Sequence, residues 1–305
     1  MFFEYSEWHN ERISLGLVQK LAIKSVLFSG TTKYQNIQII DTVPYGRCLI
    51  LDGKIQSTEY DEFIYHELLV HPAMLCFPDP MRILLAGGGE GASAREILRH
   101  NSVEKLTMVD LDKELVDLCI NFFPSMNKGV FEDPRLEVKF MDILEYLKNS
   151  NEIFDVIIFD LPDSAEGSPV SQLYTYSFYK MAYKRLSPNG VIVTQSGPTD
   201  YLNYREVFPA IHNTINQIFP SVASLSESIP SFGDSWGFTI GSLSKNPNDF
   251  NFQEIDNELL RRGIADLNFY DGFSHAGSIN LPKYLRNAIV SETRIITEEN
   301  PLHVY

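Results

Sequence analysis

Apolar and polar residues follow two different periods along the chain, and the change of period divides it into two parts. Residues 22–57 hold short runs in which apolar and polar positions alternate, with turn residues between the runs. From residue 82 onward, short apolar runs alternate with segments whose apolar residues recur every three to four positions. The first part predicts a small antiparallel β domain. The second predicts an α/β domain with a parallel sheet and right-handed crossovers.

The small N-terminal part contains three strand candidates separated by turn signals. They are Tyr34–Ile40, Arg47–Leu51 and Lys54–Ser57. Pro44–Gly46 predicts the first turn, and Asp52-Gly53 predicts a two-residue hairpin before the third strand. A helical segment, Asp61–Pro72, follows and carries acids, a tyrosine and two histidines. We therefore expect an N-terminal β-strand domain at residues 1–60 and an α/β domain at residues 61–305.

In the large part, strand candidates alternate with helix candidates. The strand candidates are Arg82–Ala86, Leu106–Asp110, Leu136–Phe140, Val156–Phe159 and Val191–Gln195. The helix candidates are Lys113–Phe122, Ile143–Lys148, Gln172–Arg185 and Tyr204–Phe219. A polar loop at Ser242–Asn251 precedes an amphipathic tail, in which Leu281–Arg286 predicts a closing helix.

The first strand of the large part ends at a glycine-rich turn that suggests a nucleoside site. The run Ile83–Ala86 stops at Gly87–Gly89, and helical spacing begins beyond Gly91. Glycines allow positive φ angles and let a ligand approach the backbone, and the start of a helix offers free N–H groups. The second strand ends in Asp110, a carboxylate placed to bind the two hydroxyls of a ribose.

An acid inside this turn, Glu90, is unusual for such a site. A pocket for a phosphate or a carboxylate would lose binding energy by placing another negative charge there. Glu90 therefore favours a ligand that carries a cation at this point. The alternative is that Glu90 faces solvent near a helix N-terminus, where acids are favoured.

Further acids follow the predicted parallel strands, at the edge of the sheet where ligands bind. Asp110, Asp142 and Asp160 each end or follow a strand, and Asp163 comes just beyond. A single acid after a strand is most often a helix cap. Four such acids together with Glu90 predict an acidic crevice.

Composition and charge narrow the classes of function. The formal charge of −15 and the absence of a Lys/Arg cluster argue against a nucleic-acid partner and favour cationic substrates. Cys48, Cys76 and Cys119 lack disulfide or metal spacing and predict reduced core thiols. No apolar run reaches the roughly 20 residues needed to span a bilayer, and the N-terminus lacks signal-peptide features. We expect a soluble cytoplasmic protein with no membrane partner.

The acids could in principle serve several kinds of chemistry. Mg²⁺ or Ca²⁺ would use carboxylates, but these acids are spread over several strand ends without a compact ligand loop, so we expect no metal. No Gly-x-Ser-x-Gly turn supports a serine hydrolase. A polyamine fits better, because carboxylates bind ammonium groups and aromatic rings cover methylenes. The aromatic residues interleaved with the acids are Tyr65, Tyr174, Phe232 and Trp236.

Several motifs resemble the polyamine aminopropyltransferases, the spermidine synthase family. The motifs are Leu51–Glu59 with Asp61–Glu67, Gly87–Gly91 with Arg95-Glu96, and Asp155–Asp163. The resemblance runs from Gln35 to Leu281–Arg286. It implies a class I methyltransferase-like, Rossmann-like domain behind a small N-terminal β domain. It also implies transfer of an aminopropyl group from decarboxylated S-adenosylmethionine to an amine, with release of 5'-methylthioadenosine, as a homodimer or homotetramer without a prosthetic group.

The resemblance also implies roles for individual residues. On the donor side it implies Gln35, Gly87, Gly88, Gly89, Glu90, Asp110, Asp142, Ile143, Asp160 and Pro169. On the acceptor side it implies Tyr65, His66, Glu90, Asp163, Glu166, Tyr174, Gln195, Phe232, Asp234 and Trp236. Asp163 aligns with the general base, and Tyr65 and His66 would orient the acceptor amine. Glu90 would attract the ammonium of the donor and repel the carboxylate of intact S-adenosylmethionine.

Two segments depart from the usual spermidine synthase pattern and resemble the thermospermine synthase branch. The loop Asp163–Pro169 is two residues longer and contains Glu166, and Ile229–Gly237 replaces a Pro-Thr-Tyr-Pro segment. Phe232 thus lacks the expected hydroxyl, and Asp234 adds an acid. We expect spermidine as the acceptor, with thermospermine or spermine as the product. Putrescine or agmatine remains the alternative acceptor, and a methyltransferase or a non-catalytic polyamine-binding protein remains a competing class.

Overall fold

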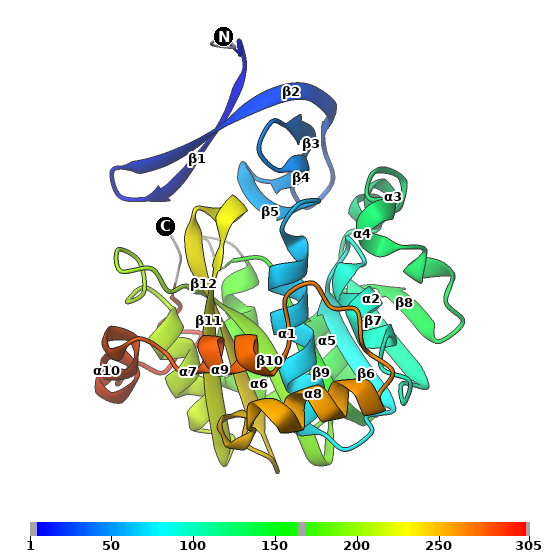
Figure 1. The fold of residues 1–305 in the computed structure, drawn as a ribbon, viewed down its shortest axis with the longest axis vertical. Helices are drawn as coiled ribbons and strands as arrows, with labels where there is room; N and C mark the ends of the chain where they lie inside the picture. Colours follow the sequence, from blue (N-terminus) through cyan, green and yellow to red (C-terminus); the bar gives the residue numbers. More distant parts are fainter. Residues whose placement is uncertain (1–4, 164–168, 303–305) are drawn as a thin grey trace.

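Two β-sheets organise the chain in the computed structural model, which describes residues 5–163 and 169–302 (Figure 1). The smaller sheet is fully antiparallel, with its strands paired in chain order. They are β1 (Trp8–Ser14), β2 (Leu17–Thr31), β3 (Asn36–Thr42), β4 (Gly46–Leu51) and β5 (Lys54–Thr58). Asp52 and Gly53 both have positive φ, 48° and 83°, as a type I′ hairpin turn requires. The predicted hairpin is therefore confirmed.

The larger sheet has seven strands in the order β11-β12-β10-β9-β6-β7-β8. They are β6 (Arg82–Gly87), β7 (Lys105–Asp110), β8 (Leu136–Phe140), β9 (Phe154–Asp160), β10 (Leu186–Pro198), β11 (Ser221–Ile229) and β12 (Asp234–Ser242). Strands β6 to β10 are parallel, and β11 and β12 form an antiparallel edge beside β10. Because β6 pairs with both β7 and β9, the chain turns to opposite sides at this strand, which creates a crevice at the carboxyl ends.

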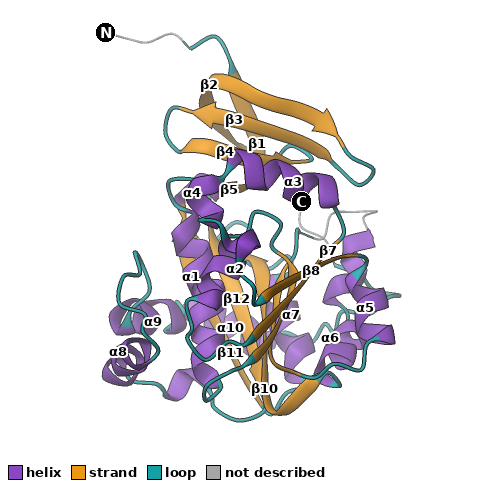
Figure 2. Cartoon of the chain, turned by 90° about the vertical axis from the view of Figure 1, so that its right-hand side faces the viewer, coloured by secondary structure: helices purple, strands orange, loops and turns teal. Residues whose placement is uncertain are grey.

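Helices cover both faces of the larger sheet (Figure 2). They are α1 (Glu62–Cys76), α2 (Ala92–Leu98), α3 (Lys113–Phe122), α4 (Pro124–Asn127), α5 (Ile143–Asn149), α6 (Tyr176–Tyr183), α7 (Phe208–Asn216), α8 (Phe252–Arg261), α9 (Gly272–Ile279) and α10 (Lys283–Ser291). Four 3₁₀ turns are η1 (Val130–Glu132), η2 (Pro169–Tyr174), η3 (Pro230–Phe232) and η4 (Pro247–Asp249).

The alternation of side chains along β6 explains the two layers of the core. Ile83 and Leu85 pack on one face with α1, α2 and α8, whereas Leu84 and Ala86 pack on the other with α5, α6 and α7. Both faces of β6 are thus apolar and buried. This matches the uninterrupted apolar run in the sequence and confirms the predicted Rossmann-like α/β sheet.

The predicted strands of the larger domain are confirmed. Two predicted helices have different boundaries, and the domain has two further strands, β11 and β12, at one edge of its sheet. The helix predicted at Gln172–Arg185 is broken at Thr175, whose hydroxyl caps the start of α6 by accepting a hydrogen bond from Phe178 N. The helix predicted at Tyr204–Phe219 begins only at Phe208, where Pro209 occupies the first turn. The strand candidates do not include β1, β2, β11 and β12. In β1 and β11 small and polar residues weaken the apolar alternation, whereas β12 does alternate, at Trp236, Phe238 and Ile240, and the prediction missed this signal.

The small sheet is fastened to the edge of the large sheet by hydrogen bonds between distant parts of the chain. Gln19 Nε2 donates to Ser231 O at 2.7 Å, and Tyr45 Oη donates to Pro230 O at 2.9 Å. Ser231 N in turn donates to Asp61 Oδ2 at 2.7 Å, just after the small sheet. The predicted domain boundary at residue 60 falls in the turn between β5 and α1.

The structure bears on two further expectations, the reduced state of the cysteines and the lack of a membrane-spanning segment. Cys48, Cys76 and Cys119 are buried free thiols, as predicted. Among the described helices, none has both the length and the apolar character that a membrane span requires.

Candidate active site

The glycine-rich turn between β6 and α2 is shaped by close backbone contacts. Gly87 and Gly88 both have φ of 77°, and a Cβ atom on Gly87 would lie 2.0 Å from Asp160 O. A side chain at this position would therefore displace β9. A Cβ atom on Gly89 would lie 3.1 Å from Asp110 Oδ2, so this glycine leaves the carboxylate open to a ligand.

A cavity of about 510 Å³ lies beside this turn, between the carboxyl ends of the parallel strands and the small sheet. Most residues predicted from the sequence line it together. They are Gln35, Tyr65, Gly87, Gly88, Gly89, Glu90, Asp110, Asp142, Ile143, Asp160, Asp163, Gln195, Phe232, Asp234 and Trp236. The strand-end acids thus share one cavity with Tyr65, Phe232 and Trp236, as the acidic crevice hypothesis required.

One half of the cavity is built around Asp110 at the end of β7. Asp110 Oδ1 accepts a hydrogen bond from Asp112 N at 2.8 Å, and burial raises the pKa of Asp110 to about 6. Asp112 caps α3 and accepts from Gln35 Nε2 at 3.0 Å, so the small sheet reaches this half of the cavity. Asp142 caps α5 by accepting from Leu144 N at 2.7 Å, so the helix-cap interpretation holds for this acid.

The middle of the cavity contains Asp160, a half-buried carboxylate with neutral hydrogen-bond donors. Tyr65 Oη donates to its Oδ1 at 3.0 Å, and Ser93 Oγ donates to its Oδ2 at 2.6 Å. Burial, together with the charge of Glu90, raises the pKa of Asp160 to about 6. This carboxylate is therefore close to its protonation midpoint in slightly acidic solution.

His66 lies behind Glu90 rather than on the cavity wall itself. Its Nε2 is 3.3 Å from Glu90 Oε1, and its Nδ1 is 2.8 Å from Glu62 Oε2. His66 Nε2 and one oxygen each of Glu90 and Asp160 lie within 4.8 Å of one another, a spacing that could hold a metal ion. Since both ring nitrogens face carboxylates, a metal would have to displace a proton from His66. The expected absence of a metal stays a prediction.

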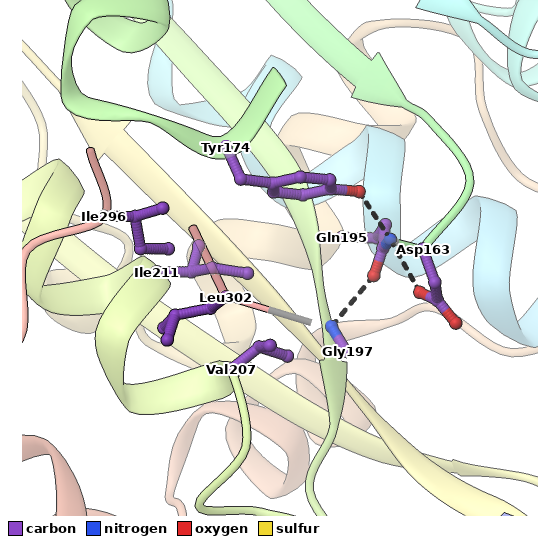
Figure 3. Close-up of a pocket in the computed structure, with 8 residues that line it drawn as sticks. All are labelled: Asp163, Tyr174, Gln195, Gly197, Val207, Ile211, Ile296 and Leu302. Atoms are coloured by element: carbon purple, nitrogen blue, oxygen red, sulfur yellow. Dashed lines mark hydrogen bonds between the residues drawn. The ribbon is translucent and has the colours of Figure 1, made fainter. Parts of the chain in front are cut away.

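The other half of the cavity is organised by Gln195 on β10 (Figure 3). Its Nε2 lies 3.0 Å from Asp163 Oδ1 and 2.7 Å from Tyr174 Oη, and its Oε1 accepts from Trp236 Nε1 at 3.0 Å. Tyr174 Oη donates onward to Pro162 O at 3.0 Å. Burial raises the pKa of Asp163, although Lys54 and the hydrogen bond from Gln195 oppose this effect. Gln195 thus fixes the position of a carboxylate that has a raised proton affinity.

Other predicted acceptor-side residues occupy different positions. Tyr174 lines a neighbouring pocket of about 10 Å³, together with Ile211 and Ile296. Asp234 lines the main cavity, but its carboxylate already accepts from Asn203 Nδ2 at 2.8 Å and Asp200 N at 3.1 Å. Glu166 lies outside the described residues. Pro169 begins η2, and its contacts with a ligand stay a prediction.

The small sheet contributes polar residues that the sequence analysis missed. Glu11 from β1 and both Lys54 and Gln56 from β5 line the cavity. Glu11 Oε2 accepts from Ile55 N at 3.0 Å, which joins β1 to β5 across the sheet. Gln56 stands inside the family motif Leu51–Glu59, which offered a signal, whereas nothing in the pattern around Glu11 distinguishes it from a surface acid.

Comparison with family models covers both parts of the chain. Residues 62–254 match the spermine/spermidine synthase domain, and residues 7–59 match the spermidine synthase tetramerisation domain. The second match coincides with the small antiparallel sheet.

Individual relatives and solved structures agree with these matches. A thermospermine synthase of Arabidopsis thaliana is 41% identical over 98% of this chain and 87% of its own length. A polyamine aminopropyltransferase of Sulfurisphaera tokodaii is 38% identical over 97% of this chain and 98% of its own length. A spermidine synthase in complex with the transition-state analogue AdoDATO superposes with a TM-score of 0.85 and 28% identity, covering 95% of this chain and 97% of that one. Spermidine synthase from Thermotoga maritima gives a TM-score of 0.83 at 27% identity, with coverage of 95% and 96%.

Proposed function

The chain belongs to the spermine/spermidine synthase family and is an aminopropyltransferase, and we propose that it transfers the aminopropyl group of decarboxylated S-adenosylmethionine to spermidine. One observation carries this proposal. A single cavity joins the glycine-rich turn and Asp110 at one end to Asp163 and Trp236 at the other. A donor and an amine acceptor could therefore bind side by side in it.

We assign the Asp110 half of the cavity to the donor. The Asp110 carboxylate would accept hydrogen bonds from the ribose hydroxyls, and Asp142 and Ile143 would lie along the adenine. Glu90 would receive the ammonium at the end of the aminopropyl arm. The same charge would repel the carboxylate of intact S-adenosylmethionine, which selects the decarboxylated donor.

We assign Asp163 as the general base. A neutral amine nitrogen must attack the methylene beside the sulfonium. A C–N bond then forms while the C–S bond breaks, and the electron pair of that bond stays on the sulfur of methylthioadenosine. The attacking nitrogen loses a proton, which Asp163 can accept because its carboxylate is held by Gln195 and has a raised pKa. Tyr65 would orient the acceptor beside Asp160.

The acceptor assignment rests on similarity and on the charges expected along the cleft. The thermospermine synthase of Arabidopsis thaliana is similar over 98% of this chain, and a triamine needs more anionic groups than a diamine. The aromatic pair Phe232 and Trp236, with ring centroids 5.1 Å apart, would cover methylenes of the acceptor. Putrescine and agmatine are the competing acceptors.

Mass spectrometry of the products is the deciding experiment. The purified protein would be incubated with decarboxylated S-adenosylmethionine and, in turn, with spermidine, putrescine and agmatine. Methylthioadenosine and a tetraamine formed fastest with spermidine would support the proposal. A wild type that prefers putrescine would be a spermidine synthase. Release of S-adenosylhomocysteine from intact S-adenosylmethionine would indicate a methyltransferase, and no turnover at all would indicate a binding protein.

We also propose an assembly and a location. The match of residues 7–59 to a tetramerisation domain supports a homo-oligomer, a dimer or a tetramer. Three buried free thiols fit the reducing cytoplasm. The strongly negative charge argues against a nucleic-acid partner.

A further inference from the structure

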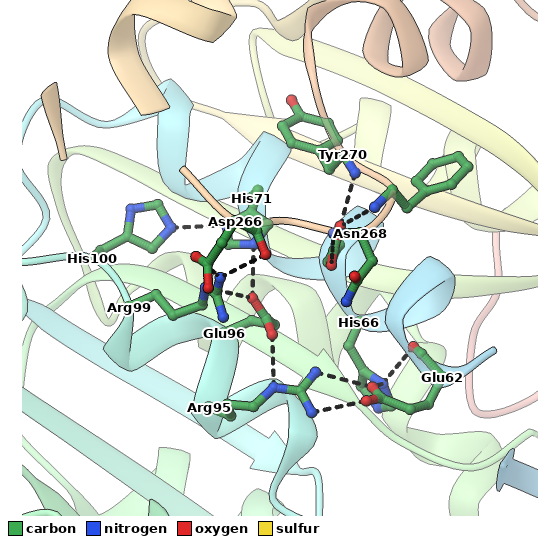
Figure 4. Close-up of polar contacts among 12 residues, drawn as sticks. Glu62, His66, His71, Arg95, Glu96, Arg99, His100, Asp266, Asn268 and Tyr270 are labelled. Carbon is green, nitrogen blue, oxygen red and sulfur yellow. Dashed lines mark hydrogen bonds and ion pairs between the residues drawn. The ribbon is translucent and has the colours of Figure 1, made fainter. Parts of the chain in front are cut away.

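A row of buried titratable side chains begins at His66, which contacts Glu90, and passes through Glu62, Arg95 and Glu96 (Figure 4). Glu62 lies between His66 and Arg95, and Arg95 lies between Glu62 and Glu96. Each contact joins an acid to a base, so the charges alternate along the row. Beyond Glu96 the row continues through His71 to His100, with contacts of 3.0 Å at each step.

The contacts of His66 define where its protons lie. Its Nδ1 is 2.7 Å from the main-chain oxygen of Glu62 and 2.8 Å from Glu62 Oε2. Both atoms can only accept, so Nδ1 must carry a hydrogen. Its Nε2 is buried and faces Glu90 Oε1 at 3.3 Å. This nitrogen makes no hydrogen bond of normal geometry to the described residues, but a lone pair on it would repel the nearby carboxylate, which favours a hydrogen on Nε2 as well.

Glu62 is held in place for this contact by Arg95. The guanidinium reaches both carboxylate oxygens of Glu62, from Nη1 to Oε1 at 2.8 Å and from Nη2 to Oε2 at 3.0 Å. Such a two-point contact fixes the plane of the carboxylate as well as its position. Arg95 is itself anchored through Nε to Glu96 Oε1 at 2.7 Å.

We propose that Glu62 and Arg95 are positioning residues that hold His66 as a doubly protonated imidazolium, which in turn aims the Glu90 carboxylate at the ammonium of the donor. This proposal rests on the proposed function, since it assigns Glu90 to the aminopropyl arm. The imidazolium engages one oxygen of Glu90 and leaves the other for the ligand. Neither Glu62 nor Arg95 needs to touch the substrate.

The electrostatic surroundings of His66 agree with this geometry. The charged or titratable groups that face it, directly or through Glu62, are Glu62 and Tyr65 from α1, Glu90 from the turn, Arg95 from α2 and Asp160 from β9. Burial alone would lower the pKa of His66, but its contacts with Glu62 and Glu90 raise it to about 10. The imidazolium therefore persists throughout the physiological pH range.

The first test needs only the wild type and one reference variant. Magic-angle-spinning ¹⁵N NMR of protein labelled at histidine would be recorded at pH 8, and the His66 signals would be assigned by their loss in His66→Gln. We expect both ring nitrogens at imidazolium shifts. A neutral tautomer at that pH would overturn the proposal, and this result does not depend on whether any Glu62 variant folds.

The second test separates positioning from mere stability. Decarboxylated S-adenosylmethionine has the ammonium arm, whereas methylthioadenosine lacks it. In Glu62→Gln we expect donor affinity to fall about tenfold or more at pH 8, because the lost charge interaction is equivalent to at least one pKa unit. The affinity for methylthioadenosine should change less than about twofold. The donor deficit should shrink at pH 6, where His66 regains its proton. Equal losses for both ligands at both pH values would overturn the proposal.

Two controls complete this test. Glu67→Gln removes another buried carboxylate of α1, one that accepts only from main-chain N–H groups of residues 268–270 in the described chain, so the ratio of donor to methylthioadenosine affinity should stay unchanged. In a His66→Gln background, Glu62→Gln should cost little donor affinity, because a neutral amide needs no counter-charge. An undiminished cost there would show a structural role. Failure of the proposed donor is distinct, since the wild type would then not bind decarboxylated S-adenosylmethionine, and a preference for putrescine over spermidine would leave this test unaffected.

Discussion

Two groups of buried acids in this protein have the same chemistry and opposite electrostatic behaviour. In the row beneath the cavity, burial would raise the pKa of Glu62 and Glu96, but contacts with histidine and arginine lower both values, that of Glu96 to about 2. On the cavity wall, burial dominates and raises the pKa of Asp110, Asp160 and Asp163. Among the described residues, Asp110 and Asp160 accept hydrogen bonds only from neutral donors and have no lysine or arginine partner, and the charge of His66 near Asp160 lowers its pKa by less than burial raises it.

The difference shows which acids stabilise the fold and which are kept for a ligand. A buried carboxylate without a cationic partner costs folding free energy, whereas a paired one is compensated. Carboxylates whose pKa is raised because they lack a cationic partner are typical of functional sites. A substrate pair that carries a sulfonium and several ammonium groups would supply the missing charge on the cavity wall. Removing individual acids from each group tests this division.

The largest expected effect is at Asp163. The change Asp163→Asn keeps the shape and the contact with Gln195 but removes the proton acceptor, so we expect kcat to fall roughly a hundredfold or more. The affinity for methylthioadenosine should be retained, which serves as the internal control. Steady-state kinetics with the decarboxylated donor measure the first quantity, and near-normal turnover would remove Asp163 from the mechanism.

The next effect is on binding at Asp110. Hydrogen bonds from ribose hydroxyls to a carboxylate contribute on the order of 1.5–3 kcal/mol, so Asp110→Ala should weaken methylthioadenosine roughly 10- to 100-fold. Asp117→Ala is a matched control, since this acid of α3 is exposed and its side chain pairs with the exposed Lys113. Calorimetry would show unchanged affinity in Asp110→Ala if the ribose assignment were wrong.

A smaller effect concerns the choice of acceptor. Glu166 and Asp234 are the acids that the usual spermidine synthase pattern lacks, and each partly solvated ion pair contributes about 1 kcal/mol. The double change Glu166→Gln/Asp234→Asn should lower kcat/KM for spermidine, relative to putrescine, about tenfold or more. Because the Asp234 carboxylate already accepts two hydrogen bonds, the single variants will show which acid acts on the triamine. An unchanged ratio would contradict a role for both.

The smallest effect is a pH dependence of stability that the cavity acids alone should produce. Asp110 has a pKa of about 6 in the folded protein, above its unfolded value, so the folded state binds more protons between those values. Lowering the pH from 7.5 to 5.5 should therefore stabilise the unliganded wild type relative to Asp110→Asn by on the order of 1 kcal/mol. Buried histidines contribute equally to both proteins and cancel. Denaturant titrations at the two pH values measure this difference, and a change of opposite sign would mean that Asp110 has a hidden cationic partner.

The elements around the turn were predictable because their sequence signals are local. The apolar run of β6, the glycines after it and the acid at the end of β7 each depend on a few adjacent residues. The hairpin at Asp52-Gly53 follows from two residues alone. Long-range partners could not be read in this way. The contact between Glu11 and Ile55, for example, depends on how β1 and β5 meet across the small sheet.

The row of buried side chains that contains Glu62 and Arg95 includes one contact that the sequence predicts and one that it does not. Glu62 and His66 are four residues apart on a predicted helix, a spacing that places them on one face, so their contact could have been anticipated. Arg95 belongs to a helix that begins 30 residues after Glu62, and only the packing of α1 against α2 brings the two together. The acidic crevice was predictable as a set of strand ends, but the separation of its acids into paired and unpaired groups required the structure.

The hydrogen bonds that join the small sheet to η3 also determine when this sheet can finish folding during synthesis on the ribosome. Gln19 and Ser231 are 212 residues apart, and Tyr45 and Pro230 are 185 apart, so these bonds have very high contact order. The small sheet emerges first but cannot take its final place until β11 and η3 have been translated. During that interval one part of the sheet, at Ile37, Ile39 and Leu49, can already pack on α3 and α4, but the part that carries Gln19 and Tyr45 still lacks its partner η3. The nascent protein should therefore depend on chaperones longest at its N-terminal end, and a truncation before residue 230 should leave that end exposed to proteases.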